Sequence, residues 1–289
     1  MEPDILASAI MDGLLIGGAY ALVAMGLAMI WGVMEIINFA HGDFMMLGAL
    51  LTFFFFTALG MDPVVGAIIA FTPIFVLGVL VQRGVINRIL DAPLLTQIAA
   101  TFAILLIIRY GVQAAFGPYT RRLVSSYSEV YIDLGFTTIP LPKLLIFVTS
   151  LIILGLLYLL LHRTDLGIAI RATSQDRRVA QLMGINVSRI YDVTFGIGVG
   201  VAAIGGGLVA LFYPIFPEMG GFFALIAFIA VVLGGFGSVY GAYAGGLIIG
   251  VAESVSALFI EPALKDVVAF LIFILIILVK PTGLFGKGE

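Results

Sequence analysis

The chain has 289 residues and a formal net charge of −3; 62% of its residues are hydrophobic and only 11% are Asp, Glu, Lys or Arg. A soluble domain averages about 25% charged residues, so this composition cannot cover a water-facing surface and excludes an ordinary soluble protein. The absence of cysteine excludes a disulfide framework and any cysteine-ligated metal site.

Long apolar runs recur along the whole chain. A bilayer core about 30 Å thick needs about 20 apolar residues per helix, and these runs lack the alternation of barrel strands. They fall at about 5–33, 36–60, 63–82, 94–116, 143–161, 190–213, 222–236, 240–260 and 263–280. We predict an all-α, polytopic transmembrane helical bundle of eight or nine membrane segments, forming a single domain over residues 1–289. Glycine and polar residues interrupt 36–60 and 222–260, which predicts broken or re-entrant helices there.

The stretch I-N-F-A-H-G-D-F-M at 37–45 is unusually polar, with Asn38, His41, Gly42 and Asp43 lying between two apolar runs. One interpretation is a helix break beside a translocation pathway or gate, where non-helical backbone is tolerated if it faces water or protein. The other is a structural turn, in which Asn38 caps the following helix and Asp43 bonds a neighbouring loop. No metal site is predicted, because the only other histidine is distant in the sequence.

Many glycines lie inside the apolar runs. Gly13, Gly17 and Gly18 follow helical spacing, and further clusters occur at 196–200 and 241–250. Small residues let membrane helices approach closely, so we predict that most of these glycines are packing positions.

Ionisable residues inside the runs are costly in a membrane and call for a partner or a role. Glu35 and Asp192 lie near expected cytoplasmic ends, where solvation at the interface explains them. Arg109 is expected either to snorkel outward or to pair with a carboxylate such as Glu253. Three polar residues share its run and could bond across helices: Gln97, Thr101 and Gln113.

The distribution of Lys and Arg predicts the orientation, because cytoplasmic loops carry the excess of basic residues. The loops at 83–93 and 162–190 are basic and are separated by two apolar runs, so both are expected in the cytoplasm. The loop at 117–142 then lies outside. Counting spans from these loops puts the N-terminus outside and the C-terminus in the cytoplasm.

The cytoplasmic loop at 163–190 contains a predicted short helix. Thr173–Asp176 has the T-x-x-D pattern of a helix start, and Gly184 supplies a stop, which together predict a helix at about 174–183. One interpretation is a helix lying on the membrane surface with its arginines on lipid phosphates. The other is a docking helix for a cytoplasmic partner. The residues concerned are Arg171, Asp176, Arg177, Val179, Ala180, Leu182, Met183, Gly184 and Ile185.

No G-x-x-x-x-G-K-[ST] phosphate loop is present, so this chain is not itself an ATPase of that class. The stretch G-F-G-S-V-Y-G at 235–241 has a different spacing and lies among apolar runs. We predict that it forms a tight turn between two membrane helices.

Several motifs together resemble the LivH-type permeases of branched-chain amino acid ABC importers. These are N-F-A-H-G at 38–42, L-G-G-x-G-S at 233–238 and P-T-G at 281–283, within the longer stretches 20–49, 167–210, 230–254 and 265–286. They occur in the family's order, and the resemblance covers nearly the whole chain, with 117–142 matching least well.

The resemblance implies a multi-pass subunit of the bacterial inner membrane that forms half of a translocation pathway. Its expected partners are a LivM-like second permease, two cytoplasmic ATPase subunits and an extracytoplasmic amino-acid-binding protein, besides the lipid bilayer. ATP would be used by the partner subunits, so the chain is expected to be no enzyme and to need no cofactor, and no nucleic-acid partner is expected. The loop helix becomes the ATPase-coupling helix.

Two other functions compete with this expectation. A self-contained secondary transporter or channel would use carboxylates such as Asp43 and Glu253 to couple ions to a small solute. A membrane-embedded enzyme is the third possibility, but no metal-ligand set or nucleophile–base pair lies at suggestive spacing.

Overall fold

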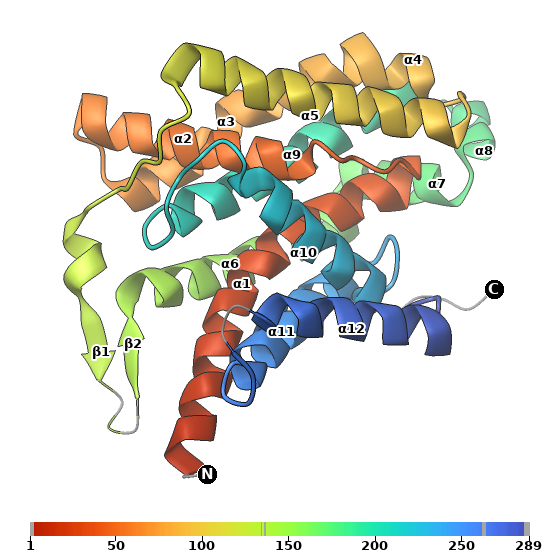
Figure 1. The fold of residues 1–289 in the computed structure, drawn as a ribbon. Helices are drawn as coiled ribbons and strands as arrows, with labels where there is room; N and C mark the ends of the chain where they lie inside the picture. Colours follow the sequence, from red (N-terminus) through yellow and green to blue (C-terminus); the bar gives the residue numbers. More distant parts are fainter. Residues whose placement is uncertain (1–2, 134, 136, 262–263, 286–289) are drawn as a thin grey trace.

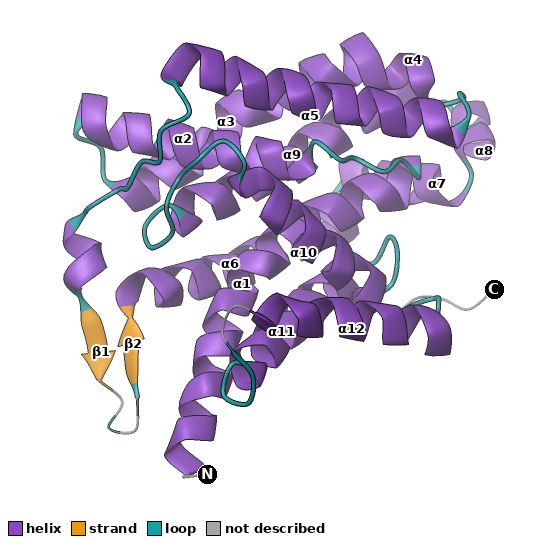
Figure 2. Ribbon diagram, viewed as in Figure 1, coloured by secondary structure: helices purple, strands orange, loops and turns teal. Residues whose placement is uncertain are grey.

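The computed structural model describes residues 3–133, 135, 137–261 and 264–285, so Gly286 of the last family-like stretch lies outside the described residues. Helices dominate the fold, and one small antiparallel hairpin projects from it (Figures 1 and 2). The helices are α1 (Pro3–Met34), α2 (His41–Leu59), α3 (Pro63–Val81), the π-helix η1 (Gln82–Ile86), α4 (Asn87–Ile89), α5 (Leu94–Phe116), the 3₁₀-helix η2 (Ser126–Glu129), α6 (Leu141–Arg163), α7 (Asp165–Gln175), α8 (Arg177–Leu182), α9 (Val187–Val209), α10 (Met219–Gly234), α11 (Val239–Ser256) and α12 (Lys265–Val279). Strands β1 (Tyr131–Asp133) and β2 (Thr138–Pro140) pair with Ile132 opposite Ile139.

Every apolar run of the sequence forms a helix, as predicted. Among the described residues, six helices are long and apolar enough to cross a membrane: α1, α2, α3 with its continuation to Ile89, α5, α6 and α9. Helices α10 and α11 meet at a bend of 117° and together make a seventh candidate, a broken span or re-entrant loop, while the apolar part of α12 is shorter. The described residues thus hold six or seven candidate spans against the eight or nine membrane segments predicted, because α10 and α11 share one bent element and the apolar part of α12 is short.

Helices α1 and α9 form the centre of the bundle. In α9, 94% of an apolar stretch of 18 residues is buried inside the protein. The corresponding share is only 22% in α5 and 22% in α6. Helix α1 packs mainly against α11 and α9 and runs through the middle of the view in Figure 1. The peripheral helices expose large apolar side chains, as expected for surfaces that face lipid.

Glycines bring α1 and α11 into backbone contact, which confirms the predicted packing role. A Cβ at Gly13 would lie 2.6 Å from the Cα of Val251, and one at Gly17 would lie 2.9 Å from the Cα of Leu247. Gly18 packs instead against Phe147 of α6. Lipid tails are as apolar as the helices, so such close van der Waals packing must hold the bundle together.

The turn between α10 and α11 is tight, as predicted for 235–241. Gly235 and Gly237 have positive φ angles of 101° and 76°, which glycine adopts without strain. Ser238 caps α11 by accepting the Gly241 amide hydrogen at 3.0 Å.

The chain's last described residues close over this turn. The amides of Leu284 and Phe285 donate to the carbonyl oxygens of Leu233 and Gly234, at 2.8 and 3.1 Å. These amides supply partners for carbonyls that the end of α10 leaves open. Gly283 also lies against Gly235, where a Cβ would come within 2.5 Å of the Gly235 Cα, so the family-like motifs at 233–238 and 281–283 are in contact.

We predict that Gly246→Val destabilises the folded protein by at least about 1–3 kcal/mol, because its Cβ would meet the Ala21 backbone nitrogen at 2.5 Å. Gly155→Val is the matched control, since no atom lies within 4 Å of a Cβ there. The measurement is thermal unfolding of the detergent-purified variants. Equal midpoints for both would contradict the packing role.

Candidate functional site

The polar stretch lies in a break between α1 and α2. Helix α1 ends at Met34, and Glu35 takes a left-handed φ of 54°, which is unusual for a residue other than glycine. Asn38 Oδ1 accepts the amide hydrogen of Ala40 at 3.2 Å, and its carbonyl accepts that of His41 at 3.2 Å. Asn38 thus closes the turn before α2 and does not cap the helix itself, since the N-cap residue is Ala40.

His41 and Gly42 begin α2 in the protein interior. His41 is completely buried, and its Nε2 lies 3.0 Å from the carbonyl oxygen of Val23. A carbonyl only accepts, so Nε2 carries the proton and donates it, and Nδ1 of the neutral ring is an acceptor. Gly42 lies against the backbone of Gly220 on α10, where a side chain would collide.

Asp43 pairs with Arg109 of α5. Arg109 Nε donates to Oδ1 at 3.1 Å and Nη2 donates to Oδ2 at 3.2 Å, a two-pronged contact with a completely buried carboxylate. The expected bond from Asp43 to a loop is corrected, because its partner lies on a helix. Of the two alternatives for Arg109, pairing with a carboxylate is the one observed, although the partner is Asp43 and not Glu253. The buried Glu253 instead accepts the hydroxyl hydrogen of Tyr20 at 2.7 Å.

Helix α5 makes two further polar contacts across the bundle. Thr101 donates to the carbonyl of Ile37 at 3.0 Å, and Gln113 donates to Glu218 at 2.6 Å. Both contacts reach other parts of the bundle, but their partners lie in the segments just before α2 and α10, whereas bonding to another helix was expected. Gln97 differs, because it donates to carbonyls at 90 and 92 in the turn that precedes its own helix.

A cavity of about 500 Å³ opens beside the break. Its walls come from α1, α5, α10 and α12, and in Figure 1 α10 runs between α5 and α12. The aromatic part of the lining is Trp31, Phe39, Phe102, Phe228, Phe236, Phe270 and Phe273. Of the four residues predicted for a pathway or gate, Asn38 and His41 line it, whereas Gly42 and Asp43 do not. Arg109 lines it too and was not among the predicted pathway residues.

The loop helix is shorter than predicted. Asp176 is its N-cap, and Oδ1 accepts the amide hydrogens of Arg178 and Val179 at 2.8 and 3.0 Å, which lowers the pKa of this carboxyl. Thr173 belongs to α7 and donates to the carbonyl of Ala169 at 2.8 Å, so the predicted start at 174 was wrong. Arg171 also lies in α7.

The predicted helix stop at Gly184 is confirmed. Gly184 has a φ of 85°. Its amide donates to the carbonyl oxygen of Gln181 and the amide of Ile185 donates to the carbonyl oxygen of Ala180, both at 3.0 Å. This pair of bonds is the Schellman motif, in which a left-handed glycine ends a helix.

The loop helix presents an apolar, exposed side. Val179, Leu182 and Met183 are 53%, 87% and 78% exposed, whereas Ala180 is buried. The helix is anchored by Arg177, whose Nη2 donates to Asp91 in the turn before α5 at 2.6 Å, and this ion pair raises the Arg177 pKa.

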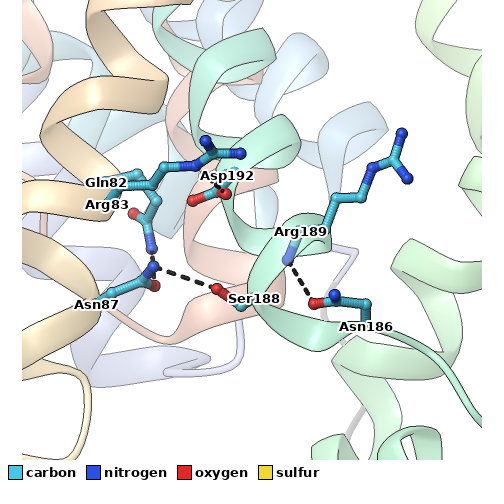
Figure 3. Close-up of polar contacts among 7 residues, drawn as sticks. All are labelled: Gln82, Arg83, Asn87, Asn186, Ser188, Arg189 and Asp192. Carbon is cyan, nitrogen blue, oxygen red and sulfur yellow. Dashed lines mark hydrogen bonds and ion pairs between the residues drawn. The ribbon is translucent and has the colours of Figure 1, made fainter.

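A polar network joins η1 to the start of α9, directly after this loop (Figure 3). Arg83 Nε donates to Asp192 Oδ2 at 2.6 Å. Gln82 donates to Asn87 at 2.9 Å, and Asn87 approaches the Ser188 hydroxyl at 3.4 Å. Asp192 is therefore buried and paired, which corrects its expected interfacial solvation, whereas Glu35 is exposed. The sequence identified residues 83–93 only as a basic loop and not as a helical segment with these contacts, because a π-helix carries no simple signature.

No group of three or more His, Asp or Glu side chains that could hold a metal ion occurs among the residues that the structure describes. The arrangement is that of a multi-pass membrane protein with a cavity among its helices and an exposed apolar helix on one loop.

The class that these features define is a membrane permease component. Residues 9–277 match the family described as "Branched-chain amino acid transport system / permease component", and the chain belongs to this family. It is a component of a transport system of the inner membrane, working with partner components, and is not an enzyme in itself. No solved structure matches the chain significantly.

Named relatives agree over almost the full length. The chain is 32% identical to "High-affinity branched-chain amino acid transport system permease protein LivH" of Salmonella typhimurium, over 96% of this chain and 94% of that protein. It is 31% identical to LivH of Escherichia coli K12, with the same coverage. It is 32% identical to the permease protein BraD of Pseudomonas aeruginosa, over 97% of this chain and 95% of BraD.

We predict that Arg109→Leu lowers the free energy of unfolding by about 3–5 kcal/mol, because it leaves the buried Asp43 carboxylate without its partner. The double variant Asp43→Leu/Arg109→Leu should recover most of the loss. Thermal unfolding in detergent measures both, and Arg177→Leu, which removes an exposed ion pair, should change little. A double variant as unstable as the single one would contradict the coupling.

Proposed function

We propose that the chain is the transmembrane permease subunit of an ATP-binding-cassette importer for branched-chain or related hydrophobic amino acids. The observation that carries the proposal is its match, over nearly its whole length, to proteins named as permeases of branched-chain amino acid transport. The chain forms half of the translocation pathway, and a second, LivM-like permease supplies the other half.

The other partners follow from the same proposal. Two cytoplasmic ATPase subunits hydrolyse ATP, so the chain needs no cofactor of its own, and an extracytoplasmic binding protein delivers the amino acid. The basic loops at 83–93 and 162–190 support a cytoplasmic position for α8, with the N-terminus outside and the C-terminus inside.

Helix α8 and the turn that ends it are the proposed docking element for an ATPase. A partner groove can take an amphipathic helix by its apolar side, and Val179, Leu182 and Met183 form such a side. The Asp176 cap and the Gly184 turn give this short segment a defined shape. Ala180 faces the protein and supports the helix from behind.

The pathway is proposed to run past the cavity at the α1–α2 break. Several lining side chains are exposed, among them Phe102, Leu225 and Phe270, so the cavity opens at the surface of this chain. A second permease packed over that opening would enclose it. The carboxylates that an ion-coupled transporter would need are already engaged, Asp43 by Arg109 and Glu253 by Tyr20.

The test is amino-acid uptake into proteoliposomes. The chain alone should transport nothing, and the chain reconstituted with its second permease, ATPases and binding protein should take up leucine when ATP is supplied. Ion-driven uptake by the chain alone would overturn the proposal.

For the docking element, we predict that Leu182→Glu or Met183→Glu abolishes ATP-driven uptake while the protein still inserts, because a charge replaces an apolar docking contact. Gln181→Glu adds the same charge on the same helix without removing apolar surface and should retain uptake. Co-purification of the ATPases gives the second readout. Full uptake by both Leu182→Glu and Met183→Glu would remove α8 from docking.

A further inference from the structure

We propose that the cavity beside the α1–α2 break is the binding site for the transported amino acid itself, with the side chain on the aromatic walls and the two charged groups at Arg109, Asn38 and His41. This inference rests on the proposed function and gives it a site. It concerns a zwitterion with an apolar side chain, and it assigns to Arg109 a role in recognition beyond its pairing with Asp43.

The shape and lining of the cavity fit such a ligand. Its volume of about 500 Å³ is within the range of small-molecule sites, which are mostly apolar with a few placed polar groups. Its walls carry many aromatic and aliphatic side chains, and its polar side chains are Asn38, His41 and Arg109. A lipid acyl chain cannot form hydrogen bonds with these three side chains, whereas an amino acid can form them with all three.

Two of the polar groups have free, buried hydrogen-bonding atoms. Asn38 Nδ2 and His41 Nδ1 have no hydrogen-bond partner in the described part of the chain, although these residues are only 4% and 0% exposed. Buried polar atoms are normally satisfied, so each such atom asks for a ligand or a water. Asn38 Oδ1 already accepts from Ala40, which leaves the amide as a donor, and the bond to Val23 leaves His41 Nδ1 as an acceptor.

This combination matches the two ends of an amino acid. The donor amide of Asn38 and the guanidinium of Arg109 suit a carboxylate, and the acceptor nitrogen of His41 suits an ammonium group. Arg109 uses two N–H groups for Asp43, and a guanidinium has five, so donors remain. Because Asp43 balances its charge, Arg109 attracts a carboxylate less strongly than a lone arginine would, which favours release.

Gly221 keeps space beside the guanidinium. A Cβ at this position would lie 3.3 Å from Arg109 Nη2 and would meet no other atom within 4 Å. Gly221→Ala therefore displaces the guanidinium slightly without touching the helix packing. Gly111→Ala is the matched control, because it lies on α5 two residues from Arg109 and has open space around its Cβ.

The first experiment uses single-cysteine variants, which the cysteine-free chain allows. Leu225→Cys lies in the cavity wall, and Leu271→Cys is a similarly exposed control on α12 outside it. Each is labelled with a maleimide in the assembled importer, in the presence of leucine, of isoamylamine, which lacks the carboxylate, or of 4-methylpentanoate, which lacks the ammonium. Leucine should slow labelling of Leu225→Cys alone, and neither analogue should do so at the same concentration.

The outcomes separate the site from the proposed function. Leucine protection without ATP-driven leucine uptake would support the site and overturn the transport proposal. Leucine uptake without leucine protection of Leu225→Cys from labelling would overturn the site. Protection by both analogues equal to that by leucine would also overturn it. Labelling of Leu225→Cys that is blocked without any ligand, both in the assembled importer and in the chain reconstituted alone, where no second permease covers the opening, would mean that lipid fills the cavity, and would also overturn the site.

The second experiment measures the role of Arg109 without breaking its ion pair. Gly221→Ala should raise the KM for leucine uptake several-fold and shift leucine protection of Leu225→Cys to higher concentrations, with kcat changed less. Gly111→Ala should leave both values unchanged. A purely structural role for Gly221 would lower the amount of folded importer and leave the KM as it is, and that result would overturn the recognition role of Arg109.

Discussion

Direct contact between helix backbones fixes the α1–α2 break, around which the proposed binding site is built. Gly26 of α1 meets Gly198 of α9, and Gly42 of α2 meets Gly220 of α10, at separations that leave no room for a side chain. The α1–α2 break is therefore fixed from two sides, and with it the positions of Asn38 and His41. In a membrane, where burial of apolar surface between helices gains little, this close packing is the main source of order.

Helix α5 is attached by a different physical principle. Only 22% of its apolar 18-residue stretch is buried inside the protein. Polar contacts of Thr101, Arg109 and Gln113 connect it to the rest of the bundle. The same helix begins just after Asp91, which holds Arg177 of the loop helix. One element thus joins the proposed docking helix to the cavity wall, and it is held by a few polar contacts and not by a packed glycine interface.

The sequence predicted the class of fold and the places where its helices are interrupted, because run length, glycine content and the basic loops are local properties. It also predicted a helix in the cytoplasmic loop and the end of that helix at Gly184, because a single glycine is enough to indicate a helix stop. Pairings between distant elements could not be read in this way. Asp43 and Arg109 lie 66 positions apart, and Arg83 and Asp192 lie 109 apart. The cavity was not predicted either, because its walls come from four separate parts of the chain.

The central position of α1 has a consequence for how the protein is made. This helix precedes its main neighbours, α9 and α11, by more than 150 residues in the chain, so it is synthesised well before them. Until then its glycine-rich surface is covered by lipid or by other membrane proteins, and the bundle can close only after residue 256 has been inserted. Assembly therefore ends with long-range contacts around this earlier segment, and a chain interrupted before α11 would leave α1 without its largest single partner.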